Sequence, residues 1–193
     1  MIAGLEGTLE SRGPDHIVLK VGGVSFRVFV PSSTLSDLGN TGARVKLHTY
    51  LQVREDALTL YGFLSLDELR LFETLLTVSG VGPRGALSML SALKPDDLAL
   101  AIASGNIDLL TTVPGIGKKT ASRLVLELKG KLEREWAMSP TVGSAGGNAE
   151  VVAALTALGY TVAEAFQAVS TLPSSDLPLE EKVRLALQGM GKR

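Results

Sequence analysis

The strongest constraint on the fold is a segment that occurs twice, with an offset of 35 residues between Gly80 and Gly115. Leu75–Ala86 aligns with Leu110–Ala121, and each copy contains a Gly-hydrophobic-Gly turn. Apolar residues continue to match further on: Met89 with Leu124, Leu90 with Val125, and Leu93 with Leu128. Duplication at a fixed period predicts one structural unit built twice, and helical spacing makes each unit a helix, a glycine turn and a second helix.

The two glycine turns predict anion sites. Glycine permits positive φ and leaves neighbouring N–H groups uncovered, and a helix N-terminus presents unpaired N–H groups with a positive dipole. We therefore expect phosphate to bind at Gly80-Val81-Gly82 and at Gly115-Ile116-Gly117, with Val81 and Ile116 inserted between the helices. The cations that could assist stand at the start of the second helices: Arg84, Lys118, Lys119 and Arg123.

Positive charge is concentrated near the second turn. The whole chain has a net charge of −1, yet residues 118–134 contain six cations and two acids, a local charge of +4. This distribution predicts a nucleic-acid site confined to a patch, because a protein that binds DNA over its whole surface is usually basic. Contacts to phosphates carry no base-sequence information and weaken steeply with salt.

The first 63 residues predict β structure. Runs with period-two alternation or β-branched residues fall between turn signals and favour five short strands, with one helical turn at Ser33–Leu38. This order favours an OB-fold barrel, with a meander sandwich as the alternative. The expected strands are Ile2–Glu10, His16–Val21, Val24–Val30, Val45–Val53 and Leu58–Phe63.

Residues 64–136 predict an all-α domain that contains the tandem repeat. Ser65 and Glu68 form a capping-box signature, and Pro95-Asp96-Asp97 is typical of a helix start. Residues 137–148 contain three glycines and no charge, which predicts a flexible linker. Residues 149–193 predict a small three-helix domain with a thin core. The fold class is therefore α+β and multidomain.

Several function classes lack the residues that they need. Gly80–Gly85 matches the dinucleotide G-x-G-x-x-G pattern but follows a helix, and Gly115–Thr120 lacks the first glycine of a Walker motif. The chain has no cysteine and no cluster of carboxylates or histidines, so we expect no catalytic residue, no metal and no cofactor. It has neither a signal peptide nor a membrane-spanning run, which predicts a cytoplasmic protein with no membrane partner.

Nearly the whole chain resembles the RuvA family of Holliday junction branch migration proteins. The matching segments lie in all three expected domains. They are Met1-Ile2, Val21-Gly22-Gly23-Val24, Val53–Ala57, Leu60–Phe63, Gly80–Pro83, Pro114–Ala121, and Ala154-Leu155 with Leu158-Gly159-Tyr160. Together these segments are specific, although each alone is not.

The resemblance implies a homotetramer, or an octamer on DNA, that seats a four-way junction against the two glycine turns and their cations. It implies an acidic pin at Glu55 and Asp56 that favours strand separation. It also implies an apolar surface at Leu155, Leu158 and Tyr160 that binds the hexameric ATPase RuvB. ATP hydrolysis would then belong to RuvB, this chain would be non-catalytic, and a junction resolvase would join the larger complex.

The residues leave two other hypotheses open. A helix-hairpin-helix glycosylase or nuclease would need a carboxylate after the hairpin, and residues 109–148 contain no aspartate. A generic DNA-binding scaffold of another repair complex could use the glycine turns as structural corners only. Such a scaffold would retain its DNA affinity without Arg84, Lys118 and Lys119.

Overall fold

The computed structural model describes residues 2–138, 147–160, 164–165, 168–169, 172 and 177–190. The chain divides into two compact units. One holds Met1–Pro95 with Val113–Gly115, and the other holds Asp96–Thr112 with Ile116–Arg193. This division falls inside the tandem repeat, so the first glycine turn belongs to the same unit as the barrel. The expected domain boundaries after residues 63, 136 and 148 stay predictions.

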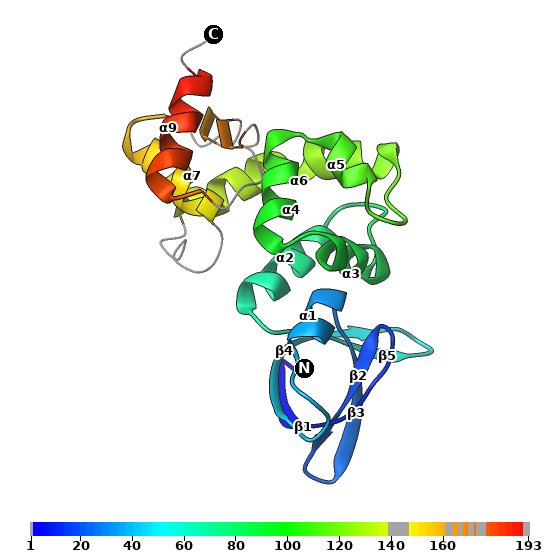
Figure 1. Ribbon diagram of the computed structural model, residues 1–193. Helices are drawn as coiled ribbons and strands as arrows, with labels where there is room; N and C mark the ends of the chain where they lie inside the picture. Colours follow the sequence, from blue (N-terminus) through cyan, green and yellow to red (C-terminus); the bar gives the residue numbers. More distant parts are fainter. Residues whose placement is uncertain are drawn as a thin grey trace. The chain divides into compact units, whose positions relative to one another are not determined.

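Five strands close into a barrel in the first unit. They are β1 (Gly4–Arg12), β2 (His16–Val21), β3 (Val24–Phe29), β4 (Arg44–Val53) and β5 (Leu58–Phe63). Their order around the barrel is β1-β2-β3-β5-β4, with β3 and β5 parallel and the other neighbours antiparallel. This OB-like arrangement confirms the predicted barrel, and the parallel β3–β5 pair excludes a meander (Figure 1).

The barrel closes because alternate residues of each strand are aliphatic. These side chains fill the interior, while the charged residues of the strands are all exposed on the outside. Closure also leaves no free strand edge that could pair with another chain. The interior residues are Leu5, Leu9, Ile17, Leu19, Val28, Val45, Leu47 and Leu60.

Helix α2 (Leu66–Leu76) lies against the outside of the barrel. It begins at Ser65, whose hydroxyl accepts a hydrogen bond from the N–H of Glu68 at 3.1 Å, and the Glu68 carboxylate accepts one from Ser65, as the capping-box signature predicts. Further along α2, the buried Phe72 ring meets three aromatic rings of β4 and β5 at centroid distances of 4.8 to 5.5 Å. These rings belong to Tyr50, Tyr61 and Phe63.

Helix α3 (Pro83–Ala92) is attached to the barrel through α1 (Ser32–Asp37), the short helix between β3 and β4. The N–H of Ser32 donates to the Ser91 hydroxyl at 3.1 Å, and the Ser32 hydroxyl donates to the Ser91 carbonyl at 3.2 Å. Since α2 and α3 are both anchored, the glycine turn between them has a defined position on the barrel (Figure 1).

Within the described residues, the regular elements of the second unit are all helices. Its labelled elements are α4 (Pro95–Ser104), α5 (Ile107–Thr111), α6 (Lys118–Met138), α7 (Gly147–Ala157) and α9 (Leu179–Met190). The acidic start of α4 agrees with the helix start expected at Pro95. No described helix is long and apolar enough to cross a membrane.

The C-terminal helices share a core of small and β-branched residues around Leu155, and Ala103 of α4 joins it. Part of the predicted third helix, between α7 and α9, lies outside the described residues. Its described residues, 164–165 and 168–169, are helical and contribute three buried side chains to this core. Most of the predicted linker, residues 139–146, also lies outside the described residues.

Candidate nucleic-acid interface

The repeat in the sequence is a repeat in local structure. The first helix of each hairpin ends at a threonine, Thr77 with φ −71° and ψ −18°, and Thr112 with φ −70° and ψ −19°. Each threonine hydroxyl donates to a carbonyl three residues earlier, that of Thr74 or Leu109, and both distances are 2.7 Å. The two turns therefore start from the same geometry.

The two glycines of each turn have different roles. Gly80 and Gly115 adopt φ of +89° and +85°, a conformation that strains any residue with a Cβ. Gly82 instead is extended, with φ −98° and ψ 172°. A Cβ added at Gly82 or at Gly117 would meet no other atom within 4 Å. Packing therefore requires glycine at neither position, and the extended backbone does not require it at Gly82. The missing side chain leaves the N-terminus of the following helix open to a ligand.

The hydrophobic residue of each turn is part of the protein core. Val81 and Ile116 are buried, as the sequence predicts, and the N–H of Val81 donates to the Val78 carbonyl at 3.0 Å. That amide is therefore used inside the turn and is not a phosphate donor. The donors that remain are in the first turns of α3 and α6, where no carbonyl one turn back can accept them.

The two helix N-termini differ in their first residue. Helix α3 begins with Pro83, which has no N–H, and its N-cap Gly82 makes no side-chain hydrogen bond. Helix α6 begins with Lys118, which contributes both an N–H and a positive charge. The second turn is therefore the richer of the two in hydrogen-bond donors and charge.

The predicted cations are accessible to different degrees. Arg84, Lys118 and Lys119 are exposed, whereas Arg123 is half-buried and lies 3.8 Å from the Glu127 carboxylate. Lys118 and Lys119 are consecutive at the start of α6, and Arg123 follows one helical turn after Lys119. The second unit thus brings three of the four predicted cations together, and Arg84 belongs to the first unit.

Pro114, the residue before the second glycine turn, is hydrogen-bonded to a helix of the first hairpin. The Ser88 hydroxyl of α3 donates to the Pro114 carbonyl at 3.0 Å, and both residues belong to the first unit. The sequence pattern did not reveal this hydrogen bond, because serine is common on helix surfaces and its partners cannot be read from spacing.

Glu55 and Asp56 lie exposed at the tip of the β4–β5 hairpin, which extends beyond the barrel (Figure 1). The N–H of Arg54 donates to the Ala57 carbonyl at 2.9 Å and closes the tip. Behind the acids, Val53 and Leu58 face each other across the strands and are 68% and 72% exposed. Because side chains alternate along a strand, both residues lie on the face that lines the barrel interior nearer the barrel. That face is uncovered here because the hairpin extends beyond the end of the barrel.

The predicted partner surface is smaller than expected. Leu158 and Tyr160 are exposed, 61% and 37%, but Leu155 is fully buried in the C-terminal core. Leu155 therefore cannot offer its side chain to a partner, and this part of the prediction is corrected. Its carbonyl accepts the N–H of Tyr160 at 3.2 Å, which closes the end of α7 beside the exposed pair.

Among the residues that the structure describes, no three histidine, cysteine or acidic side chains gather as a metal site would require. The histidines belong to the barrel: His16 pairs with Asp15 at 2.8 Å and lies against Phe29, while His48 is half-buried on β4. The site that the geometry does build is a pair of open helix N-termini with adjacent cations, which suits phosphate groups.

A closed OB-like barrel in the same chain as two helix-hairpin-helix motifs defines a nucleic-acid-binding protein. Comparison with protein families narrows this class. The RuvA N terminal domain matches residues 1–62, the SAM-like helix-hairpin-helix tandem matches residues 72–131, and the RuvA C-terminal domain matches residues 147–191. The chain belongs to the RuvA family.

Curated relatives match over nearly their full length. A protein of Dehalococcoides mccartyi is 50% identical over 97% of both chains, and one of Roseiflexus sp. is 50% identical over 97% of this chain and 98% of its own. A protein of Leptothrix cholodnii is 47% identical over 100% of both chains. Each is named Holliday junction branch migration complex subunit RuvA.

The two glycines of the first turn should respond differently to alanine. Gly80→Ala should lower the free energy of unfolding by about 1–2 kcal/mol, because it forces a Cβ into the left-handed region. Gly82→Ala should change it by only about 0.5 kcal/mol, since a poorer N-cap is offset by a less flexible unfolded chain. Urea denaturation of both variants measures the difference, and equal destabilisation would contradict the separate roles.

Proposed function

We propose that this protein binds four-way (Holliday) junction DNA through the sugar-phosphate backbone and positions a motor ATPase for branch migration in recombination and repair. The observation that carries the proposal is the pair of matching turns, each opening onto a helix N-terminus with no side chain above Gly82 or Gly117. The names of the relatives and the three matched domain models support the same substrate.

Binding by this site is independent of base sequence. The donors are backbone amides and the charges come from Arg84, Lys118, Lys119 and Arg123, all of which suit phosphate oxygens rather than base edges. The glycine at the second position of each turn lets a DNA strand approach the helix N-terminus without meeting a side chain. Two such sites in one chain can each hold a phosphate of the DNA backbone.

The assembly that suits a four-armed substrate is a homotetramer, with a second tetramer forming an octamer on DNA, because each subunit then holds one arm. Glu55 and Asp56 would meet the strands at the crossover. Their exposed carboxylates repel phosphates and favour separation of the strands. The protein is non-catalytic in this proposal and works through binding and charge alone.

The C-terminal domain, residues 149–193, supplies the contact to the motor. Leu158 and Tyr160 form an exposed apolar pair at the end of α7, and exposed apolar groups of this kind mark protein contacts. We assign this pair to binding of the hexameric ATPase RuvB, which would hydrolyse ATP. A junction resolvase would be a further partner of the larger complex.

The working domain boundaries of the proposal are 1–63 for the barrel, 64–136 for the tandem hairpins, 137–148 for a linker and 149–193 for the motor-binding domain. The ranges of the three matched family models, 1–62, 72–131 and 147–191, support this division.

A synthetic four-way junction should bind more tightly than linear duplex of the same sequence, as measured by fluorescence anisotropy over a series of KCl concentrations. Combining Arg84→Ala, Lys118→Ala and Lys119→Ala should weaken binding at least tenfold and lower the salt slope by about 0.9 for each phosphate that is no longer neutralised. Equal affinity for junction and duplex, or an unchanged slope in the variant, would favour the generic scaffold instead.

Neutralising the acidic tip should separate binding from migration. Glu55→Gln combined with Asp56→Asn should leave junction affinity unchanged or tighter, because repulsion of phosphates is removed, while the rate of RuvB-driven strand exchange changes. Asp37→Asn, which removes an exposed charge from α1, is the control and should alter neither quantity. A normal migration rate in the double variant would remove the role assigned to the tip.

The motor contact should depend on the exposed pair at the end of α7. Leu158→Ser with Tyr160→Ser should lower the affinity for RuvB at least tenfold and leave junction binding intact, because both side chains are accessible and lie outside the tandem hairpins. Leu126→Ser, at an exposed large hydrophobic residue of α6, is the control. Surface plasmon resonance with RuvB measures the effect, and equal affinity of both variants would argue against this contact.

A further inference from the structure

Most cations of the barrel strands already have oxygen partners. Lys20 lies 3.6 Å from Glu10, Arg44 lies 3.0 Å from Glu6, and Arg12 donates to the carbonyls of Leu35 and Leu38. Three arginines of the first unit have no carboxylate partner among the described residues, although the side-chain oxygen of Gln52 accepts hydrogen bonds from Arg54 at 3.3 Å. Arg27, Arg54 and Arg84 are exposed, and none forms an ion pair within the part of the chain that the structure describes.

Two of these arginines, Arg54 and Arg84, act on the buried Tyr61, and Arg27 lies further along the neighbouring strand. Tyr61 of β5 is the register partner of Phe29 of β3, and their ring centroids are 5.9 Å apart. Arg27 precedes Phe29 by two residues, so it lies on the same outer face, about 7 Å further along the strand. Burial raises the pKa of the Tyr61 hydroxyl, and the nearby positive charges of Arg84 and Arg54 oppose that rise.

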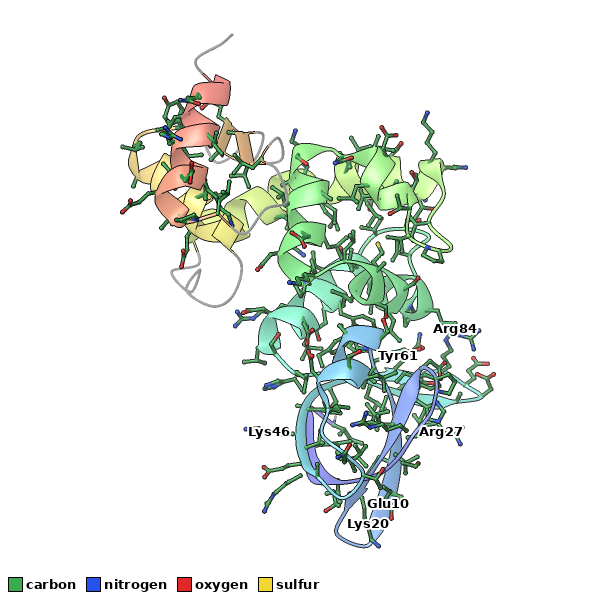
Figure 2. The ribbon with its side chains drawn as sticks, viewed as in Figure 1. Glu10, Lys20, Arg27, Lys46, Tyr61 and Arg84 are labelled. Atoms are coloured by element: carbon green, nitrogen blue, oxygen red, sulfur yellow. The ribbon has the colours of Figure 1, made fainter. Side chains whose placement is uncertain are left out.

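The surface between the arginines is polar and uncharged. Gln52 of β4 and Thr59 of β5 are register partners on the outer face, one step from the Tyr50–Tyr61 pair toward the hairpin tip. Figure 2 shows Arg27, Tyr61 and Arg84 on the same side of the unit, with Lys46 on the opposite side of the barrel. The acids closest to Arg54 in the sequence are those of the tip, Glu55 and Asp56.

We propose that Arg27, Arg54 and Arg84 form a second phosphate-binding surface, which continues the first glycine turn across the outer face of the barrel. The ligand is the backbone of one DNA strand, because the cations are spread along a strip and the side chains between them, Gln52 and Thr59, are polar and uncharged. The inference rests on the function proposed above and adds the barrel to the DNA-binding machinery.

The position of this strip gives it a specific task. Arg54 stands beside the two acids of the tip, so the field along the hairpin changes sign within a few residues. A strand repelled by Glu55 and Asp56 is attracted by the arginines behind them. The barrel face therefore holds a strand that has left the crossover and leads it to the helix N-terminus beside Arg84.

A charge variant on the barrel tests the strip. Arg27→Gln should weaken junction binding about fivefold at low salt and lower the salt slope by about 0.9, while Arg27→Lys should restore most of the slope. The matched control is Lys46→Gln, which removes one exposed positive charge from the opposite side of the barrel. The slope of this control should equal that of the unaltered protein.

Cross-linking tests which molecule covers the strip. The chain has no cysteine, so Thr59→Cys places a single thiol between Arg27 and Arg54 for a photoreactive label. We expect illumination with junction DNA to attach DNA to the protein, and Lys46→Cys to give little product. A cross-link from position 59 to a second copy of the chain, with no DNA product, would overturn the inference.

The outcomes separate this inference from the proposed function. If Arg27→Gln and Lys46→Gln have the same slope, the strip is not a phosphate site, although junction preference and the Arg84, Lys118 and Lys119 effects can persist. If the unaltered protein fails to prefer the junction, the function itself is wrong. Thermal melting of Arg27→Gln should match the unaltered protein, because the side chain is exposed.

Discussion

The packing of Phe72 on the barrel is the interaction on which the first unit depends. A single ring of α2 meets Tyr50, Tyr61 and Phe63, and such aromatic pairs contribute about 1 kcal/mol each beyond the area that they bury. The same Tyr61 lies within the electrostatic reach of Arg84 and Arg54. One hydrophobic cluster therefore holds the hairpin on the barrel and sets the cations of both elements beside each other.

In the proposed function, one short glycine turn serves both folding and binding. A left-handed glycine, Gly80 or Gly115, reverses the chain, and a buried Val81 or Ile116 holds the reversed chain in the core. The second glycine serves neither of these purposes. At Gly82 the backbone is extended and a Cβ would have room, so neither the backbone nor the packing requires glycine there, and we assign this position to the approach of the DNA backbone. In each turn the central hydrophobic residue is buried, and the glycine on either side of it is exposed.

A net charge of −1 is compatible with a DNA-binding protein because the charges are sorted by position. Many acids outside the hairpin tip are paired or cap helices, as Glu6, Glu10 and Glu68 show. Lys118 and Lys119 are exposed at the start of α6, and Arg27, Arg54 and Arg84 are exposed in the first unit without an ion pair among the described residues. Binding as proposed therefore depends on local fields rather than on total charge, and in that proposal the two exposed acids at the hairpin tip repel phosphates that the cations attract.

The sequence alone determined the elements, because alternation, capping signatures and the repeat of 35 residues are local patterns that report directly on backbone geometry. It placed the five strands within a few residues, and it correctly predicted that Val81 and Ile116 of the two turns are buried. Only the tertiary structure decided which side chains remain accessible. Leu155 shares the apolar pattern of Leu158 but is buried. Arg27 is far from Arg84 in the chain yet lies on the same side of the first unit, because burial and position depend on which elements pack together.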